Sequence, residues 1–373
     1  MKSFKFKFIK IYLFRFIIFC VQYILYHPKH FHPSNIRKIL IVRLKHLGDY
    51  ILTLPLLQTF KAHFPDAQVI IATGIWNRHL VQEFDQNIDK TYYYNVKRYC
   101  RRKDQVMHWR HKLLILRNIS KQHVDLVIDL DGSVGFLWLY LLKRVKSLSS
   151  IESLRFLQNL KQLGIVKNAK TSYNIHSQHE MLNLAEALNR LGLKSIPIAT
   201  NIKSKPDSEH AIDFFFQTNQ IEGHAPIIGV HPTASLGSKL WDEEKFAALA
   251  DKLVEKYRAK IILFGAREEQ PRIRAIQSQM RHPAIDGTML TLAQFIAAVK
   301  RCHLIVCLDS LPQHVALLQN VPAVVIYRTN SFRRWTPSNS DNFSIVFDEN
   351  GIEVADVLKK IPKTFSSKFE MIR

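Results

Sequence analysis

Short runs of mostly apolar residues recur along the chain, and each is followed by apolar positions at helical spacing. In the first half the runs fall at 39–42, 69–71 and 125–129. A short continuous apolar run is typical of a strand that is buried on both faces of a parallel sheet. Strands that alternate with helices predict βαβ units, and a helix at 177–190 is expected to close this half.

The same alternation starts again after a polar stretch around Pro206. Further strands are expected at 227–230, 260–264, 304–308 and 323–327, and helices at 243–257, from about 268, at 292–300 and at 312–318. The pattern therefore predicts an N-terminal Rossmann-like domain at 35–205, a C-terminal one at 206–345, and a tail or helix at 346–373. Two doubly wound α/β domains predict a ligand cleft between the carboxyl ends of their strands.

The first residues follow a different pattern. Residues 4–26 are rich in Phe, Ile, Leu and Tyr, but Arg15 and Gln22 interrupt their longest apolar stretch. No small-residue cleavage site appears before His27, and an apolar, aromatic segment flanked by Lys is typical of a helix lying in the membrane interface. We therefore expect residues 1–34 to form a basic, amphipathic, membrane-associating segment; a true anchor and a helix packed on the protein are the alternatives.

The charge of the chain favours anionic partners. Lys and Arg total 53 against 31 Asp and Glu, a net charge of +22, and no acidic residue precedes Asp49. Such an excess suits nucleic acid, anionic lipid or a phosphorylated substrate. Because no recognised nucleic-acid motif accompanies the charge, we expect the inner-membrane surface and no nucleic acid as partner.

The first candidate motif is His46-Leu47-Gly48-Asp49, with Pro55 six residues after the aspartate. It falls where the first strand passes into the first helix, so Asp49 is expected near the helix N-terminus, facing the cleft. A side chain there either takes part in chemistry or caps the helix. The residues alone leave both interpretations open.

Two further motifs in the second half suit a nucleotide. In 231–241 a strand leads into a loop carrying Thr233, Ser235 and Lys239 and then into a helix, which is a plausible cradle for an anion. In 264–269 the carboxylates Glu268 and Glu269 follow a strand end, where such a group binds ribose hydroxyls or only favours the helix dipole.

The last motif covers residues 308–314, where Asp309 and Ser310 follow a strand and a helix is expected from Pro312. The free N–H groups of that helix terminus suit a diphosphate. His314 lies one turn further on, where a histidine is either part of the site or structural.

Taken in this order, the four motifs resemble glycosyltransferase family 9, the ADP-heptose:lipopolysaccharide heptosyltransferases. The resemblance rests on Gly48-Asp49 with Pro55, on Lys239-Leu240-Trp241, on Gly265 with Glu268 or Glu269, and on Asp309-Ser310 with His314. It covers about residues 37–340. It implies a GT-B fold, in which two Rossmann-like domains face each other across a cleft.

The resemblance also implies an activity. It is the inverting, metal-independent transfer of a heptose from ADP-heptose to the inner core of lipopolysaccharide or lipooligosaccharide. Asp49 would be the catalytic base and Lys239, beside Thr233 or Ser235, would neutralise the diphosphate. Glu268 or Glu269 would hold the ribose, and Asp309, Ser310 and the helix carrying His314 would bind the donor.

No metal and no cofactor other than the nucleotide sugar are expected, and the acceptor would be an anionic glycolipid of the lipid A–Kdo type. This implies a cytoplasmic protein, peripheral on the inner face of the bacterial inner membrane. The chain departs from the family pattern at three places: Leu311 replaces a glycine, Asp242 a proline, and Tyr327-Arg328-Thr329 a G-P-T sequence. These departures leave two alternatives: a family member that uses another nucleotide sugar, or an inactive one that serves as a membrane-surface scaffold.

Overall fold

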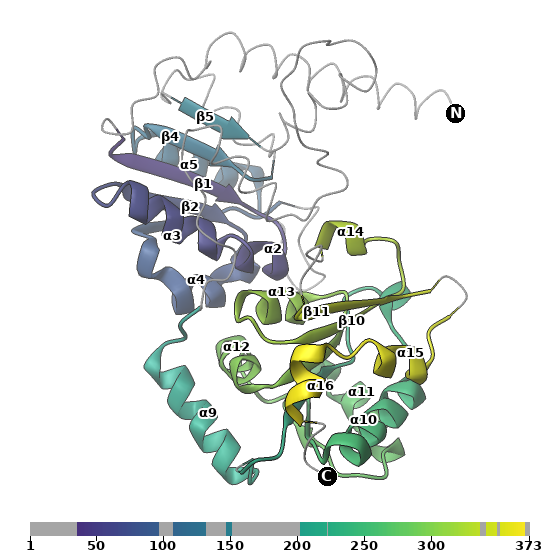
Figure 1. Ribbon diagram of the computed structural model, residues 1–373. Helices are drawn as coiled ribbons and strands as arrows, with labels where there is room; N and C mark the ends of the chain where they lie inside the picture. Colours follow the sequence, from purple (N-terminus) through teal and green to yellow (C-terminus); the bar gives the residue numbers. More distant parts are fainter. Residues whose placement is uncertain are drawn as a thin grey trace, which may run out of the picture. The chain divides into compact units, whose positions relative to one another are not determined.

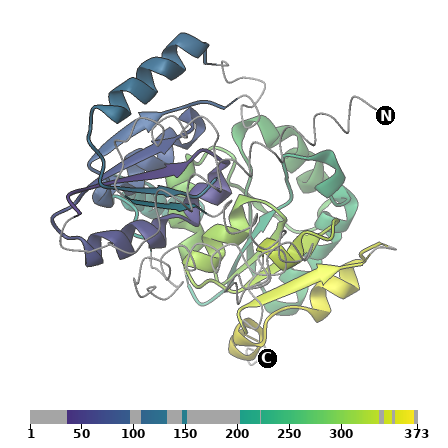
Figure 2. The same cartoon turned by 90° about the horizontal axis from the view of Figure 1, so that it is seen from above.

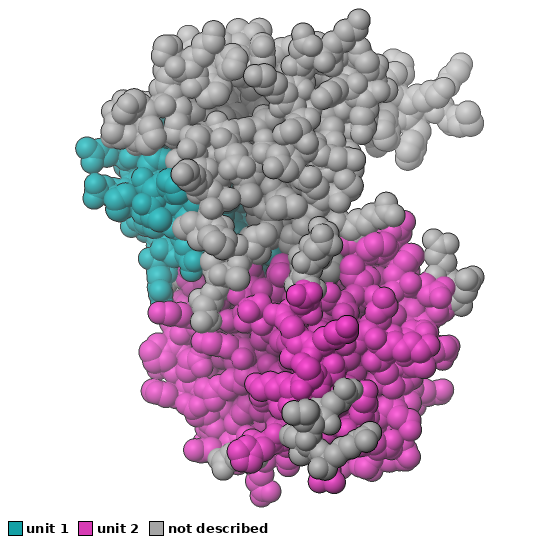
Figure 3. Space-filling view, in the orientation of Figure 1, with its two compact units in different colours: residues 1–78, 85–196 teal, residues 79–84, 197–373 magenta. Residues whose placement is uncertain are grey.

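The computed structural model describes residues 36–96, 107–131, 147–150, 202–221, 223–335, 341–348 and 351–369. The expected membrane-associating segment and the expected helix at 177–190 lie outside these residues. The chain divides into two compact units, coloured separately in Figure 3: residues 1–78 with 85–196, and residues 79–84 with 197–373.

The described residues of the first unit form a parallel sheet of five strands in the order β3-β2-β1-β4-β5. Its elements are β1 (Lys38–Arg43), α2 (Leu47–Ile51), α3 (Leu54–His63), β2 (Gln68–Thr73), β3 (Lys90–Tyr93), α5 (Trp109–Ser120), β4 (Leu126–Asp129) and β5 (Ser147–Ser150). The central strand β1 is buried along almost its whole length, as its continuous apolar run predicts.

Helices cover both faces of this sheet (Figures 1 and 2), with α3 on one face and α5 on the other. Because side chains alternate along a strand, Leu40 and Val42 of β1 point to the α5 face. There they join a buried cluster with Leu116 and Ile119 of the helix. Burial of that cluster holds α5 against the sheet.

The second unit is built on a parallel sheet of six strands in the order β11-β10-β9-β6-β7-β8. Its strands are β6 (Ile227–His231), β7 (Lys260–Leu263), β8 (Ile285–Asp286), β9 (Leu304–Leu308), β10 (Ala323–Tyr327) and β11 (Phe343–Phe347). Its longer helices are α9 (Pro206–Thr218), α10 (Glu243–Tyr257), α11 (Gln270–Gln279), α12 (Leu292–Arg301) and α13 (Leu311–Leu318). The short helices are α4 (Arg78–Phe84), α14 (Phe332–Trp335), α15 (Val354–Lys359) and α16 (Lys363–Phe369), together with one-turn segments at Gly237–Lys239 and Arg267–Glu269.

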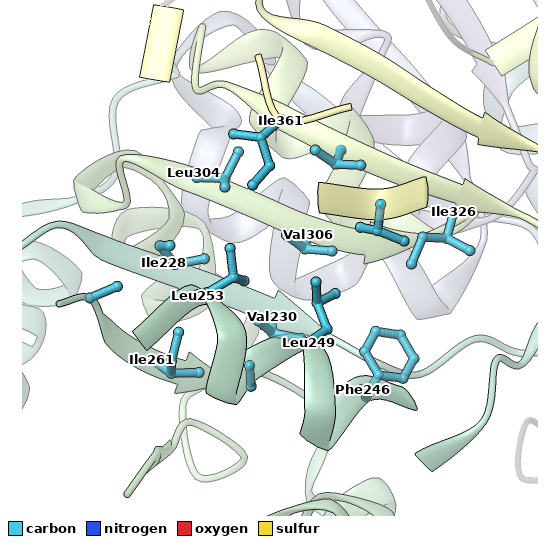
Figure 4. Packing of buried hydrophobic residues seen from close by; sticks show 14 of the residues in the cluster. Ile228, Val230, Phe246, Leu249, Leu253, Ile261, Leu304, Val306, Ile326 and Ile361 are labelled. Atoms are coloured by element: carbon cyan, nitrogen blue, oxygen red, sulfur yellow. The ribbon is translucent and has the colours of Figure 1, made fainter. Parts of the chain in front are cut away.

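The core of this unit lies between the sheet and α10 (Figure 4), where Leu249 and Leu253 pack on the strand residues Val230 and Val306. On the other face α12 carries Phe295 against Phe264, with 5.1 Å between the ring centroids. Both faces of the sheet are thus covered, as a parallel sheet requires.

The C-terminal residues are part of the same core. Ile352, Phe365 and Phe369 belong to the buried cluster of α10 and the sheet, and the Ile352 carbonyl accepts a hydrogen bond from Trp241 Nε1 at 2.9 Å. Residues 351–369, the described part of the stretch that the sequence set apart as a tail or helix, therefore complete the hydrophobic core of the second unit.

Several sequence expectations agree with the element bounds. The helix at 243–257 and the strands at 304–308 and 323–327 are found with the same ends, and α13 begins one residue earlier than expected, at Leu311. The sequence did not predict β3, α5, α9 or β11. Among the helices of the described ranges, none is both long and apolar enough to cross a membrane.

Candidate functional site

Each sheet has one point where the order of its strands reverses. In the first unit this switch point lies between β1 and β4, and in the second between β6 and β9. Connections leave the two strands in opposite directions there, which opens a crevice at their carboxyl ends where doubly wound sheets bind ligands. The candidate residues lie at these two places.

Asp49 lies at the switch point of the first unit. It is the third residue of α2, and His46, not Asp49, occupies the N-cap position. The Asp49 side chain is 11% exposed. Asp49 is therefore not the N-cap of α2, which was one of the two roles that the sequence left open.

Arg43, the last residue of β1, connects Asp49 to the neighbouring strand. Its guanidinium is fully buried; Nε donates to the Asp49 main-chain oxygen at 3.0 Å, and Nη2 lies 3.5 Å from Asp49 Oδ1. On its other side Nη1 pairs with Asp131 Oδ1 at 3.1 Å and reaches the Leu130 carbonyl at 3.3 Å. One buried cation thus binds both the backbone and the carboxylate of Asp49.

Asp131 fixes the loop that follows β1. Its Oδ2 accepts hydrogen bonds from the main-chain N–H groups of Leu44 and, at 3.2 Å, Lys45. Lys45 Nζ lies 3.5 Å from Asp131 Oδ1. The carboxylates of Asp49 and Asp131 and the cations of Arg43 and Lys45 therefore meet at this end of the sheet.

Lys239 and Asp309 form the centre of the site in the second unit. Lys239 Nζ lies 2.6 Å from Asp309 Oδ2 and donates to the Asp309 main-chain oxygen at 3.2 Å. The two side chains are 21% and 5% exposed, respectively. This pair joins the loop after β6 to the end of β9, although the two residues lie 70 positions apart in the sequence.

The Asp309 carboxylate accepts two further hydrogen bonds. Ser331 Oγ donates to its Oδ2 at 2.8 Å, and Gln313 Nε2 donates to its Oδ1 at 3.0 Å. Gln313 in turn accepts a hydrogen bond from the Tyr327 hydroxyl at 2.6 Å. A buried carboxylate with three donors is held in one orientation, and so is the lysine that pairs with it.

Thr233 and Glu269 form a second contact at the same sheet edge. Thr233 Oγ1, which is buried, donates to Glu269 Oε2 at 2.8 Å, and the same oxygen accepts from the Ala266 N–H at 2.7 Å. Thr233 Oγ1 also lies 3.3 Å from His231 Nδ1. Desolvation lowers the pKa of His231, although the Glu269 carboxylate opposes the shift, so the ring is neutral at neutral pH.

The remaining candidates differ in their surroundings. Ser310 is the N-cap of α13, and its hydroxyl turns back to the carbonyl of Thr233 at 3.3 Å. Ser235 and Glu268 are exposed, whereas His314 is buried, with its ring 5.6 Å from that of Trp335. Of the paired alternatives, Thr233 and Glu269 thus contact each other, while Ser235 and Glu268 face solvent.

The departures from the family pattern have structural counterparts. Leu311, in place of a glycine, is the first residue of α13 and is half-buried. Asp242, in place of a proline, is the N-cap of α10. Trp241, which directly precedes Asp242, is 1% exposed. It packs its ring against Phe246, with 4.9 Å between centroids, so it is a core residue.

Sequence reasoning missed residues that complete the two clusters, among them Arg43, Asp131, Gln313, Tyr327 and Ser331. A signal existed for the first pair, because an arginine ends an otherwise apolar strand and an aspartate follows the strand that pairs with it. No comparable signal marked Ser331, which lies 22 residues after Asp309 in a segment without a strand.

The sequence matches the family model described as glycosyltransferase family 9 (heptosyltransferase) over residues 112–357. It is 26% identical over 310 residues to lipooligosaccharide heptosyltransferase 2 of Campylobacter jejuni, with 80% of this chain and 83% of the relative covered. It is 21% identical over 299 residues to lipopolysaccharide heptosyltransferase 3 of Escherichia coli K12, with 79% and 83% covered.

Solved structures share the fold. A family 9 glycosyltransferase from Veillonella parvula superposes with a TM-score of 0.71 at 20% identity, over 89% of this chain and 98% of that one. The ADP-heptose lipopolysaccharide heptosyltransferase II of Escherichia coli gives a TM-score of 0.62 at 16% identity, over 89% and 99%. At these identities the likeness shows a common α/β fold with parallel sheets.

Proposed function

Because the chain belongs to glycosyltransferase family 9 and is therefore a glycosyltransferase, we propose that it transfers a heptose from ADP-heptose to the inner core of lipopolysaccharide or lipooligosaccharide. Relatives named for heptose transfer to these glycolipids support the substrates. We also propose that the two Rossmann-like units face each other in the GT-B manner.

The observation that carries this proposal is the Lys239–Asp309 pair at the switch point of the second sheet. It places a largely buried ammonium beside the start of α13, whose first-turn N–H groups are not capped by the Ser310 side chain. A fixed cation and a helix N-terminus together suit a nucleotide diphosphate. Glu269, anchored through one oxygen by Thr233 and Ala266, is the better placed of the two carboxylates to hold the ribose.

The proposed reaction is a single displacement with inversion. The Asp49 carboxylate accepts the proton of the acceptor hydroxyl while that oxygen bonds to the anomeric carbon of the heptose. The bond from that carbon to the phosphate oxygen breaks, and ADP leaves with the electron pair. Lys239 and the α13 N-terminus offset the charge that develops on the diphosphate, a task that a metal ion performs in other transferases.

A panel of nucleotide sugars tests the donor class directly. A ligand that binds only the folded protein raises its unfolding temperature, and at equal concentration the ligand with the lower Kd raises it more. We expect ADP-heptose to raise the midpoint more than UDP or GDP sugars do, and transfer to a Kdo-containing acceptor to follow. A larger shift with another nucleotide sugar would favour the alternative donor.

Leu311 supports one alternative function, that of an inactive membrane-surface scaffold. A leucine at the first position of α13 places a side chain where the family's glycine leaves the backbone open to a ligand. ADP binding without transfer or donor hydrolysis would favour this role. Turnover by the unaltered protein would exclude it.

Lys239→Ala is expected to weaken ADP binding. The substitution removes a charge-assisted contact to the diphosphate, which contributes about 1.5–3 kcal/mol, or about 10–150-fold in Kd. Isothermal titration with ADP measures the change. Activity of the unaltered enzyme should persist in EDTA, because Lys239 rather than a metal ion is proposed to offset the charge.

Lys245→Ala provides the matched control for Lys239→Ala. Lys245 belongs to the same unit, its side chain is 28% exposed, and it contacts Glu353, Asp242 and the Ile352 carbonyl, none of which is a proposed site residue. We expect it to leave the Kd of ADP unchanged. An equal loss in both variants would mean that the binding responds only to net charge.

We further propose that the protein works in the cytoplasm, bound peripherally to the inner face of the inner membrane by residues 1–34. Their apolar and basic composition supports this position. Deletion of residues 2–30 is expected to release the protein from membranes at high salt and to preserve turnover on a water-soluble acceptor. Unfolding of the truncated protein would instead indicate that the segment packs on the first unit.

A further inference from the structure

Helix α5 exposes three large apolar side chains to solvent. Trp109, Leu113 and Leu114 are 59%, 52% and 53% exposed. The opposite side of the helix is already packed, because Leu116 and Ile119 are buried against the sheet and Lys112 Nζ lies 5.9 Å from the ring centroid of Tyr94. The exposed apolar side chains therefore do not belong to the core of this unit.

The charges on the same outer face are all positive. Arg110, Arg117 and Lys121 are exposed, and at 100° per residue they lie between Leu113 and Leu114 around the helix. No aspartate or glutamate occurs from Trp109 to Lys121. The outer face of α5 thus combines apolar side chains with basic ones and carries no opposing charge.

From this combination we propose that the outer face of α5 is a second membrane-docking surface, which binds anionic lipid headgroups through Arg110, Arg117 and Lys121. Trp109, Leu113 and Leu114 insert at the boundary between headgroups and acyl chains. Tryptophan favours that boundary, and basic residues near it are attracted to an anionic leaflet. The choice of a lipid surface rests on the proposed glycolipid acceptor.

The chain contains a contrasting helix that shows what is particular to α5. Phe214 of α9 is 70% exposed, yet α9 carries Asp207, Glu209 and Asp213 and no lysine or arginine. Glu209 and Asp213 pair with Arg301, so α9 offers an anionic leaflet no unopposed positive charge. Exposure of an apolar side chain alone therefore does not mark a docking surface, whereas its combination with unopposed positive charge does.

The test measures binding of the full-length protein to sedimented vesicles of phosphatidylcholine, with and without phosphatidylglycerol. Trp109→Ser/Leu113→Ser/Leu114→Ser is expected to lower the partition coefficient on the anionic vesicles on the order of 100-fold, since each half-exposed side chain contributes about five-fold on insertion. Arg110→Gln/Arg117→Gln/Lys121→Gln should lower it by a similar factor at low salt. The control Phe214→Ser should leave it unchanged.

Several results would overturn the proposal. Vesicle binding within two-fold of the unaltered protein in both triple variants would do so. If the triple substitutions change the oligomeric state in the absence of vesicles, the face contacts a second copy of the chain. If they lower the midpoint of unfolding, the face packs against the chain's own first residues. Loss of oligonucleotide binding with unchanged vesicle binding would assign it to nucleic acid.

Turnover separates this proposal from the proposed function. Both triple variants are expected to keep the kcat of the unaltered enzyme on a water-soluble acceptor, because α5 carries none of the proposed site residues. If the unaltered enzyme transfers no heptose but binds vesicles through α5, the donor or acceptor is wrong and the docking surface stands. If it transfers heptose while α5 is irrelevant to vesicle binding, only the docking surface fails.

Discussion

Asp49→Asn is expected to lower the rate of heptose transfer about 10²–10⁴-fold, the usual effect of losing a general base. The amide has nearly the same shape as the carboxylate but cannot accept the proton of the acceptor hydroxyl. The bond from Arg43 Nε goes to the main-chain oxygen of Asp49, so it survives the substitution. Single-turnover transfer from ADP-heptose, with the acceptor saturating, measures the chemical step.

Two properties should change little or not at all in this variant. The Kd of ADP should not move, because the proposed donor residues belong to the second unit, and the midpoint of unfolding should fall only slightly. Asp131→Asn is the matched control, since Asp131 is 7% exposed and also pairs with Arg43, but it lies outside the proposed chemistry. We expect Asp131→Asn to reduce stability more than turnover; near-normal turnover in Asp49→Asn would refute the base.

The fold was predictable because its signals are local. The apolar run at 304–308 indicates a buried strand by its composition alone. The segment at 243–257 indicates a helix by its own periodicity. Short or amphipathic elements were missed. Strand β3 is only four residues long and exposes Lys90, so it lacks the continuous apolar run of the predicted strands. The helical periodicity of α5 is as clear as that of α10 and was missed.

The candidate site was predictable only in part, because its side chains depend on contacts between distant residues. The sequence placed Lys239 and Asp309 at the ends of expected strands, and the switch point of the sheet brings them to 2.6 Å. It could not show that Asp309 would bind the lysine. Its carboxylate already accepts from Lys239, Ser331 and Gln313, so we propose that Asp309 positions Lys239 rather than binding the phosphates directly.

Arg43→Met is expected to destabilise the first unit by about 3–5 kcal/mol, because removing one partner of a buried ion pair leaves the other charge uncompensated. Methionine fills a similar volume but donates no hydrogen bond. The variant loses contacts to the Leu130 carbonyl, Asp131 and the main-chain oxygen of Asp49. Transfer should fall as well, since Arg43 fixes the turn that carries the proposed base; guanidinium chloride unfolding and single-turnover kinetics measure the two effects.

A double substitution tests whether the buried charges cause the loss. In Arg43→Met/Asp131→Asn the uncompensated carboxylate is gone, so part of the lost stability should return, and the pairwise coupling follows from the cycle of the two single variants and the double one. Arg43→Lys should fall between the unaltered protein and Arg43→Met, because it keeps the charge but cannot reach Asp49 and Asp131 with one planar group. Additive losses in the cycle would mean that the Arg43–Asp131 pair contributes no coupling energy, and that Arg43 stabilises the unit through its packing and its bonds to Asp49 and the Leu130 carbonyl.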